Sequence, residues 1–168
     1  MEGNSIRIVF AGLLVTFSML FGCPVYLHGN GLHVALTYHF FHANIFHLAA
    51  NVLSIWVIFA KDRRYAWCSL IVAYVCATIS WYCTSSDVVG ISNMIFALLG
   101  LRTPSLKDGW WRRRTVIVFL LVTAGMALVP GISAGTHLVS FFLGVLFASF
   151  RRILMMIRSD YYRASYNR

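Results

Sequence analysis

The stretch HANIFHLAAN, residues 42–51, opens an apolar run that continues to residue 60 and carries two polar side chains inside it. His47 and Asn51 are four residues apart, so a helix would present both on the same face. Polar and ionisable groups inside a membrane helix cost free energy, and they are rare there without a partner or a function. Taken alone, the pair is more simply explained by hydrogen bonds between membrane helices.

Composition extends this interpretation to the whole chain. Of the 168 residues, 60% are hydrophobic and 11% are charged, whereas a soluble domain carries about 25% charged residues. Six apolar stretches can be drawn: Ile6–Leu27, Asn44–Ala60, Ala66–Cys83, Val88–Leu101, Thr115–Pro130 and Thr136–Leu154. The fourth and fifth are shorter than the roughly 20 residues that a span needs, so neighbouring helices must shield them. We expect an all-α membrane protein, a bundle of six transmembrane helices that forms one domain over residues 1–168.

The basic residues fall on one side of this six-span scheme. The net charge is +9, and all 14 Lys and Arg residues lie on the side of the membrane that holds the two termini. The opposite loops carry only Asp87 as a charged residue. The positive-inside rule therefore places both termini in the cytoplasm. The charge indicates topology and attraction to anionic lipid rather than binding to nucleic acid.

The first span has a second interpretation. Residues 6–23 faintly resemble a signal peptide that ends at a lipoprotein-type cysteine, Cys23. The acidic Glu2 offsets the positive charge of Arg7, whereas a signal peptide has a net positive segment before its apolar run. Cleavage would also remove the first span and with it the one-sided distribution of Lys and Arg, so we expect a retained span. Cys23 and Cys83 both fall near the outer face and could pair, but the four cysteines give no disulfide framework.

Two further polar residues stand near the starts of the fourth and sixth spans. In the sequence GISN, residues 90–93, a glycine two residues before Ser92 allows a tight turn with close backbone approach. Such a turn leaves the Ser92 backbone N–H free at the positive end of a helix. The simpler alternative is that Ser92 caps this helix.

His137 heads a stripe of small residues on the sixth span. The stripe continues through Ser140, Gly144 and Ala148, and the fourth span offers Gly90, Ala97 and Gly100. Small residues at a spacing of four let another helix come close. We therefore expect the two spans to pack together and to bring His137 within hydrogen-bond reach of Ser92, although a lone buried histidine is more often structural.

The four polar residues share a depth in the membrane. At about 1.5 Å per residue, Ser92 and Asn51 lie about 15 Å above the cytoplasmic ends of their spans, and His47 and His137 about 21 Å. In a hydrocarbon core of about 30 Å, all four fall in its outer half, as the parts of one site should. Asp and Glu total five, and none is placed to join them. A Ser–His dyad without a carboxylate is the most that the chain could assemble there.

These residues resemble the motifs of the rhomboid family of intramembrane serine proteases, over nearly the whole chain. The family pattern His-x4-His-x3-Asn matches His42, His47 and Asn51, the pattern Gly-x-Ser matches Gly90 and Ser92, and a sixth-span histidine with a later glycine matches His137 and Gly144.

The resemblance implies a role for each of these residues. Ser92 would be the nucleophile and His137 its general base. His47 and Asn51, with the Ser92 N–H, would form the oxyanion hole. His42 would orient a loop, Gly90 and Gly144 would support the close approach, and Phe96 would occupy an aromatic position that packs against the catalytic histidine.

The sequence also departs from the family pattern. Phe96 stands where a tyrosine is frequent, and Asn93 stands where a glycine is common after the nucleophile. Ser140 replaces a glycine three residues after the histidine, which is expected to loosen the approach of the fourth and sixth spans slightly. The first outer loop, residues 23–42, lacks the Trp-Arg pair of many members.

The implied function is that of an intramembrane serine endopeptidase, which cleaves transmembrane segments near their outer end without a cofactor. Its partner would be a transmembrane protein substrate that enters from the lipid. The protein would lie in the cell (inner) membrane, with the site open to the extracytoplasmic side.

Two alternatives remain open beside the protease. One is a non-proteolytic rhomboid-like protein that binds or escorts membrane clients, although such proteins typically lack the catalytic serine or histidine. The other is a metal site at His39, His42 and His47, which lacks an acidic or cysteine ligand at suitable spacing. The sequence does not indicate the oligomeric state.

Overall fold

The computed structural model describes residues 8–9, 11–16, 18, 31–59, 66–84, 89–106, 108–128 and 133–166. Within these ranges every regular element is helical, and residues 8–9, 11–16 and 18 are also helical. The labelled elements are α2 (Leu32–Thr37), η1 (Tyr38–Phe40), α3 (Ile45–Phe59), α4 (Ala66–Thr84), α5 (Ser92–Arg102), η2 (Thr103–Ser105), α6 (Gly109–Ala127) and α7 (Ala134–Tyr166). The predicted all-α class is confirmed.

Each of the second to sixth apolar stretches corresponds to one helix, with differences at the ends. Helix α6 begins at Gly109 rather than Thr115, because the side chain of Asp108 accepts a hydrogen bond from the Trp110 N–H and caps it. Helix α7 continues to Tyr166, beyond the predicted end at Leu154. The first outer loop, for which the sequence analysis predicts no helix, contains α2 and η1.

Helix length gives fewer candidate spans than the sequence does. Among the described residues, Trp67–Thr84 and Ala134–Ser159 are long and apolar enough to cross a membrane. A third span results if His33–Phe40 and Ile45–Val57, which meet at 86°, are counted as one broken span. The structure is therefore that of a helical protein with two or three candidate spans, and the count of six stays a prediction.

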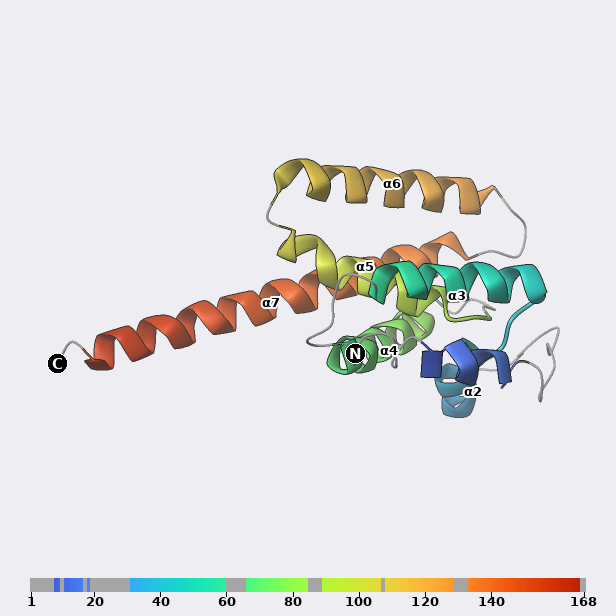
Figure 1. Ribbon diagram of the computed structural model, residues 1–168, viewed down its shortest axis with the longest axis horizontal. Helices are drawn as coiled ribbons and strands as arrows, with labels where there is room; N and C mark the ends of the chain where they lie inside the picture. The colour runs from blue at the N-terminus through green and yellow to red at the C-terminus, as the bar shows by residue number, and fades with distance from the viewer. Residues whose placement is uncertain are drawn as a thin grey trace.

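Helix α5 is short but enclosed. Its 11 residues are about 16 Å long at 1.5 Å per residue, about half the hydrocarbon thickness. Most of them are buried, from Ser92 to Leu98 and again at Gly100. In Figure 1, α5 lies among α3, α4 and α7, and it contacts all three. The predicted shielding by neighbouring helices is confirmed for this stretch but is wrong for the fifth, because α6 has 19 residues and only Phe119 and Thr123 of it are buried.

Helices α5 and α7 pack backbone against backbone. A Cβ atom at Gly100 would overlap the Phe141 carbonyl oxygen, and one at Gly144 would overlap the Ala97 carbonyl oxygen. The predicted close approach through small residues is therefore present. The expected loosening at Ser140 is wrong, because its side chain turns to α4 instead and meets the Ser80 hydroxyl at 2.6 Å.

The far half of α7 extends past the other helices toward the C-terminus, as Figure 1 shows. Ile153, Leu154 and Ile157 on this half are exposed. The Arg152 guanidinium donates to the Pro104 carbonyl at 2.9 Å, beside η2. This contact marks the level at which α7 leaves the packed bundle.

Candidate active site

Ser92 and His137 meet where α5 and α7 begin. The His137 Nε2 atom lies 2.8 Å from the Ser92 Oγ atom. Ser92 is 9% exposed and His137 is 3% exposed, so bulk water has little access to the pair in this conformation. The contact follows from the glycine-mediated packing of the two helices, because both residues stand about two turns before the Gly100–Gly144 crossing. A serine hydroxyl paired with an imidazole nitrogen at this distance can transfer its proton when the oxygen attacks.

The turn before Ser92 has the conformation that the Gly-x-Ser pattern predicted. Gly90 has a φ of +103°, a region that favours glycine because it lacks a Cβ. The cap residue of α5 is Ile91, with no side-chain cap hydrogen bond. Ser92 is thus the first helical residue, and the alternative that it caps the helix is wrong. Its N–H belongs to the first turn, where the helix offers no acceptor.

His47 and Asn51 reach this turn from α3. A Cβ atom at Gly90 would lie 2.7 Å from His47 Cε1, 3.0 Å from His47 Nε2 and 3.3 Å from Asn51 Nδ2. Two constraints therefore favour glycine at position 90: the positive φ angle, and the lack of room for a Cβ atom beside the side chains of His47 and Asn51. Asn51 Nδ2 is buried and has no hydrogen-bond partner among the described residues. A buried donor without a partner is unusual in a native protein and asks for an explanation.

His42 lies behind His47. The two imidazole rings are 5.3 Å apart, edge to face, and His42 is 1% exposed. Its Nδ1 atom lies 3.3 Å from the Ser18 hydroxyl, which in turn donates to the Phe40 carbonyl. His42 thus connects the loop before α3 to the first helical segment and packs against one of the two α3 residues near Gly90.

The three histidines considered for a metal do not converge. His39 faces α4, where its Nε2 atom lies 3.3 Å from the Thr78 hydroxyl and its ring lies 4.8 Å from that of Tyr74. In the part of the chain that the structure describes, no group of three metal-ligating side chains could hold an ion. The ring of His39 instead helps to fix η1 against α4.

An aromatic cluster supports His137 from the other side. The Phe96 ring lies 4.6 Å from the His137 ring and 5.5 Å from the ring of Phe119 on α6. Phe119 stacks on Phe141 of α7 at 3.8 Å. Phe96 therefore packs against the histidine as the resemblance implied, and the cluster ties α6 to α5 and α7.

The structure adds one residue that the sequence analysis missed. Tyr38 is fully buried in η1, and its carbonyl oxygen accepts from the Gly90 N–H at 3.0 Å. Its hydroxyl lies 3.0 Å from Asn93 Nδ2. Tyr38 therefore touches the Ser92 segment on both sides of the serine. No sequence signal indicated this role, because Tyr38 belongs to no motif and lies between the first two apolar stretches.

Among the residues that the structure describes, no carboxylate pairs with His137. Its Nδ1 atom is buried and has no hydrogen-bond partner within the described ranges, and Asp108 is used to cap α6. The side chains near Ser92 are thus a serine, histidines and an asparagine. They can accept a proton and donate hydrogen bonds to a developing oxyanion.

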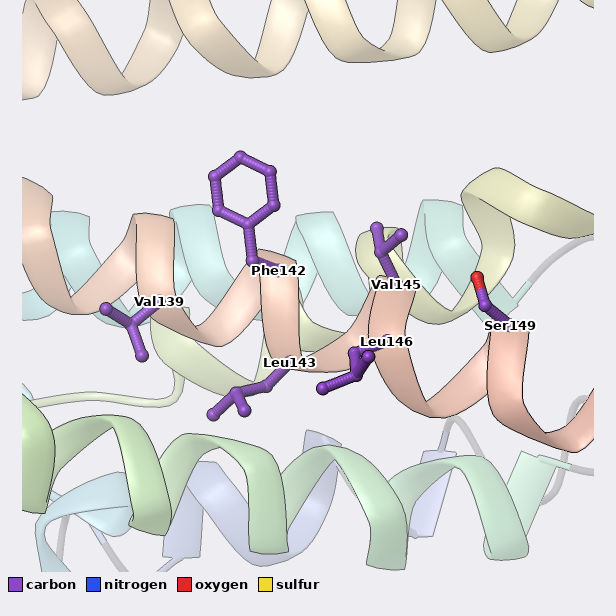
Figure 2. Close-up of a pocket in the computed structure, with 6 residues that line it drawn as sticks. All are labelled: Val139, Phe142, Leu143, Val145, Leu146 and Ser149. Carbon is purple, nitrogen blue, oxygen red and sulfur yellow. The ribbon is translucent and has the colours of Figure 1, made fainter.

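An apolar pocket of about 510 Å³ lies along α7, apart from this group. Its lining residues are Val139, Phe142, Leu143, Val145, Leu146 and Ser149. Figure 2 shows that Phe142 points toward α6 and Leu143 toward α4. None of the six belongs to the group around Ser92, so the pocket is not part of the candidate site.

Comparison with known proteins indicates the family of the chain. A family model described as Rhomboid domain matches residues 29–153. The match covers most of the chain and contains every residue named at the site except Ser18. Searches of curated proteins and of solved structures gave no significant match. The chain belongs to the rhomboid family, whose members are generally intramembrane serine proteases and include some inactive ones.

Proposed function

We propose that this protein is an intramembrane serine endopeptidase with Ser92 as nucleophile and His137 as general base. The observation that carries the proposal is the contact of 2.8 Å between Ser92 Oγ and His137 Nε2, in a chain of a family whose members are generally proteases of this kind. A non-proteolytic member would have no need to bury a paired serine and histidine at the start of two tightly packed helices.

The reaction begins when Ser92 Oγ attacks the carbonyl carbon of the scissile peptide bond. His137 Nε2 takes the hydroxyl proton, and the carbonyl oxygen becomes an oxyanion. His137 then gives the proton to the leaving amine as the C–N bond breaks, which leaves an acyl-enzyme. A water molecule that loses its proton to His137 attacks the ester, and the return of the proton to Ser92 releases the carboxylate product.

The oxyanion would be stabilised by three donors. These are the Ser92 N–H at the start of α5 and the side chains of Asn51 and His47 beside Gly90. Donors fixed in place before the charge develops lower the barrier because they need no reorganisation during the reaction. This role also explains why Asn51 Nδ2 lacks a partner, since its partner would be present only with substrate.

The proposed setting follows from the charge distribution along the sequence. The chain would form a single catalytic domain over residues 1–168 with six spans and both termini in the cytoplasm. The site would open to the extracytoplasmic side of the cell membrane, and the substrate would be a transmembrane segment that enters from the lipid. Water must reach Ser92 for the second half of the reaction, which is consistent with a site in the outer half of the membrane.

The test is cleavage of a single-span model substrate by the purified protein in detergent. We expect cleavage by the wild type, none by Ser92→Ala and unchanged cleavage by Ser54→Ala. Ser54 is a matched control because it is a half-buried serine of α3 whose hydroxyl donates to the Ala50 carbonyl at 2.8 Å, and it makes no hydrogen bond to Ser92 or His137 among the described residues. Binding of the substrate without cleavage by the folded wild type would instead support a protein that binds or escorts membrane clients.

A further inference from the structure

A continuous chain of buried hydrogen bonds connects the segment that carries Ser92 to the helix that carries His137. It begins at Asn93, the residue after the serine, whose Nδ2 atom donates to the Tyr38 hydroxyl at 3.0 Å. The Tyr38 hydroxyl donates to the Ala77 carbonyl on α4, also at 3.0 Å. The first half of this hydrogen-bond network therefore runs from α5 through η1 to α4.

The second half runs from α4 to α7. The Ser80 hydroxyl donates to the same Ala77 carbonyl at 2.7 Å, and Ser140 lies 2.6 Å from Ser80. Because the Ser80 proton is directed to Ala77, Ser140 must be the donor in that last contact. Ser140 is three residues after His137, close to one helical turn away. Each of the five residues is fully buried.

Helix α4 holds α7 at a second point near His137. The Thr84 and Thr136 hydroxyls are 2.8 Å apart, and Thr136 directly precedes His137. On the other side, Trp81 of α4 packs on the Tyr38 ring, with ring centroids 6.3 Å apart. The helix α4 thus contributes no residue to the site but contacts the residues on both sides of it.

We infer that the chain Asn93–Tyr38–Ala77–Ser80–Ser140, here called the α4 brace, sets the distance between Ser92 and His137, and that Tyr38 and Ser80 are positioning residues for the proposed reaction. The inference rests on the proposed function, since it concerns the alignment of the same serine and histidine. Tyr38 also accepts from the Gly90 N–H through its carbonyl oxygen. It therefore fixes the 90–93 turn at two points, with Ser92 between them.

The physical reason is that buried hydrogen bonds restrict the groups they join, although Asn93 Oδ1, at one end of the network, has no partner among the described residues. Breaking one member leaves another polar group unpaired in a low-dielectric interior, which costs more than the net gain of a typical hydrogen bond. Each member is therefore held in one geometry. A displacement of about 1 Å in a reacting group can cost roughly 10²-fold in rate, so a brace that fixes both helices to α4 has a direct effect on proton transfer.

The first test is Tyr38→Phe in the cleavage assay. This change keeps the ring that packs on Trp81 and removes the hydroxyl at the centre of the brace. We expect kcat per folded molecule to fall about 10- to 10²-fold with KM unchanged. Tyr74→Phe is the matched control, because the Tyr74 hydroxyl also ties α4 to the same loop, through the Leu36 carbonyl at 2.6 Å, but is not one of the hydrogen bonds of the brace. It should keep the kcat of the wild type.

The second test is a double-mutant cycle between the two ends of the brace. Asn93→Ala and Ser140→Ala change residues on different helices, and independent effects on kcat would multiply. If the brace acts as one unit, the kcat of the double variant is no lower than the kcat of the less active single variant. The pair Asn93→Ala and Tyr74→Phe, in contrast, should give independent effects.

The outcomes separate the inference from the function on which it rests. An active wild type whose Tyr38→Phe and Asn93→Ala variants keep their kcat per folded molecule would overturn the brace and leave the protease intact. Multiplicative effects in the cycle would overturn it as well. A folded wild type that neither cleaves nor reacts with a serine-directed probe would overturn the proposed function and the brace together.

Discussion

Gly144 on α7 lies directly against the carbonyl oxygen of Ala97 on α5, so that no side chain separates the two backbones. The reciprocal contact of Gly100 with Phe141 makes the crossing symmetrical. Ser92 and His137 stand at the same end of this helix pair. The position of one relative to the other is thus determined by glycines that carry no chemistry themselves.

Gly144→Ala should therefore reduce both stability and activity. The added methyl group would overlap the Ala97 carbonyl, and overpacking of a tight contact typically costs about 1–3 kcal/mol. The control is Gly125→Ala on α6, where a Cβ would meet nothing within 4 Å. We expect a lower melting temperature for the first variant and an equal or higher one for the second, as measured by thermal unfolding in detergent. Equal melting temperatures would mean that α5 and α7 are not in contact.

Gly90→Ala tests the turn that presents Ser92. Alanine would have to adopt a φ near +103°, which costs of order 1–3 kcal/mol, and its methyl group would meet His47. We expect strong loss of cleavage with the helical circular dichroism retained. Gly135→Ala is a suitable comparison because a Cβ there meets nothing within 4 Å. Full activity of Gly90→Ala would show that the turn is not under this constraint.

Asn51→Ala and His47→Ala separate the oxyanion hole from a packing role. Removing one such donor typically lowers kcat by about 10²–10³-fold, and KM should change little because the donors act on charge that develops in the transition state. The measurement is kcat and melting temperature for each variant. Loss of stability with kcat per folded molecule unchanged would mean that both residues only pack α3 against the turn.

The six-span topology can be tested with single cysteines in a background without the native ones. Reagents confined to the cytoplasmic side should label cysteines at Lys107 and Arg163, and external reagents should label one at Asp87. The prediction rests on the distribution of all 14 Lys and Arg residues in the sequence, since Lys107 and Asp87 lie outside the described residues. Labelling of positions 87 and 107 from the same side would contradict the scheme.

The sequence predicted the helices and the grouping of the polar residues because both depend on local patterns. Apolar runs indicate helices, and the glycines at 90, 100 and 144 predict a tight turn and a close crossing. The start of α6 was missed because the cap at Asp108 extends a helix through charged residues that hydropathy counts as a loop. The α2–η1 segment was missed because no periodic pattern marks so short an element.

The two ends of the brace stand where the family pattern has glycine, and only for Ser140 did the sequence analysis predict a consequence, which is wrong. Asn93 and Ser140 were recorded as departures from glycine, and Ser140 was expected to loosen the helix pair. In the structure each faces a buried hydroxyl, Tyr38 or Ser80. A pairing through α4 between residues so far apart in sequence is a tertiary relationship that one sequence does not show. The pairing of Cys23 with Cys83 stays untested, because Cys23 lies outside the described residues.

The most direct measurement of the central claim is labelling by a fluorophosphonate probe, with the modified residue identified by mass spectrometry. The account predicts one adduct, on Ser92, in the folded wild-type protein. The adduct should disappear in Ser92→Ala and in His137→Ala and form slowly in Asn51→Ala. Absence of labelling in the folded wild type, or labelling that is unchanged in Ser92→Ala, would contradict the claim that Ser92 and His137 form a catalytic pair.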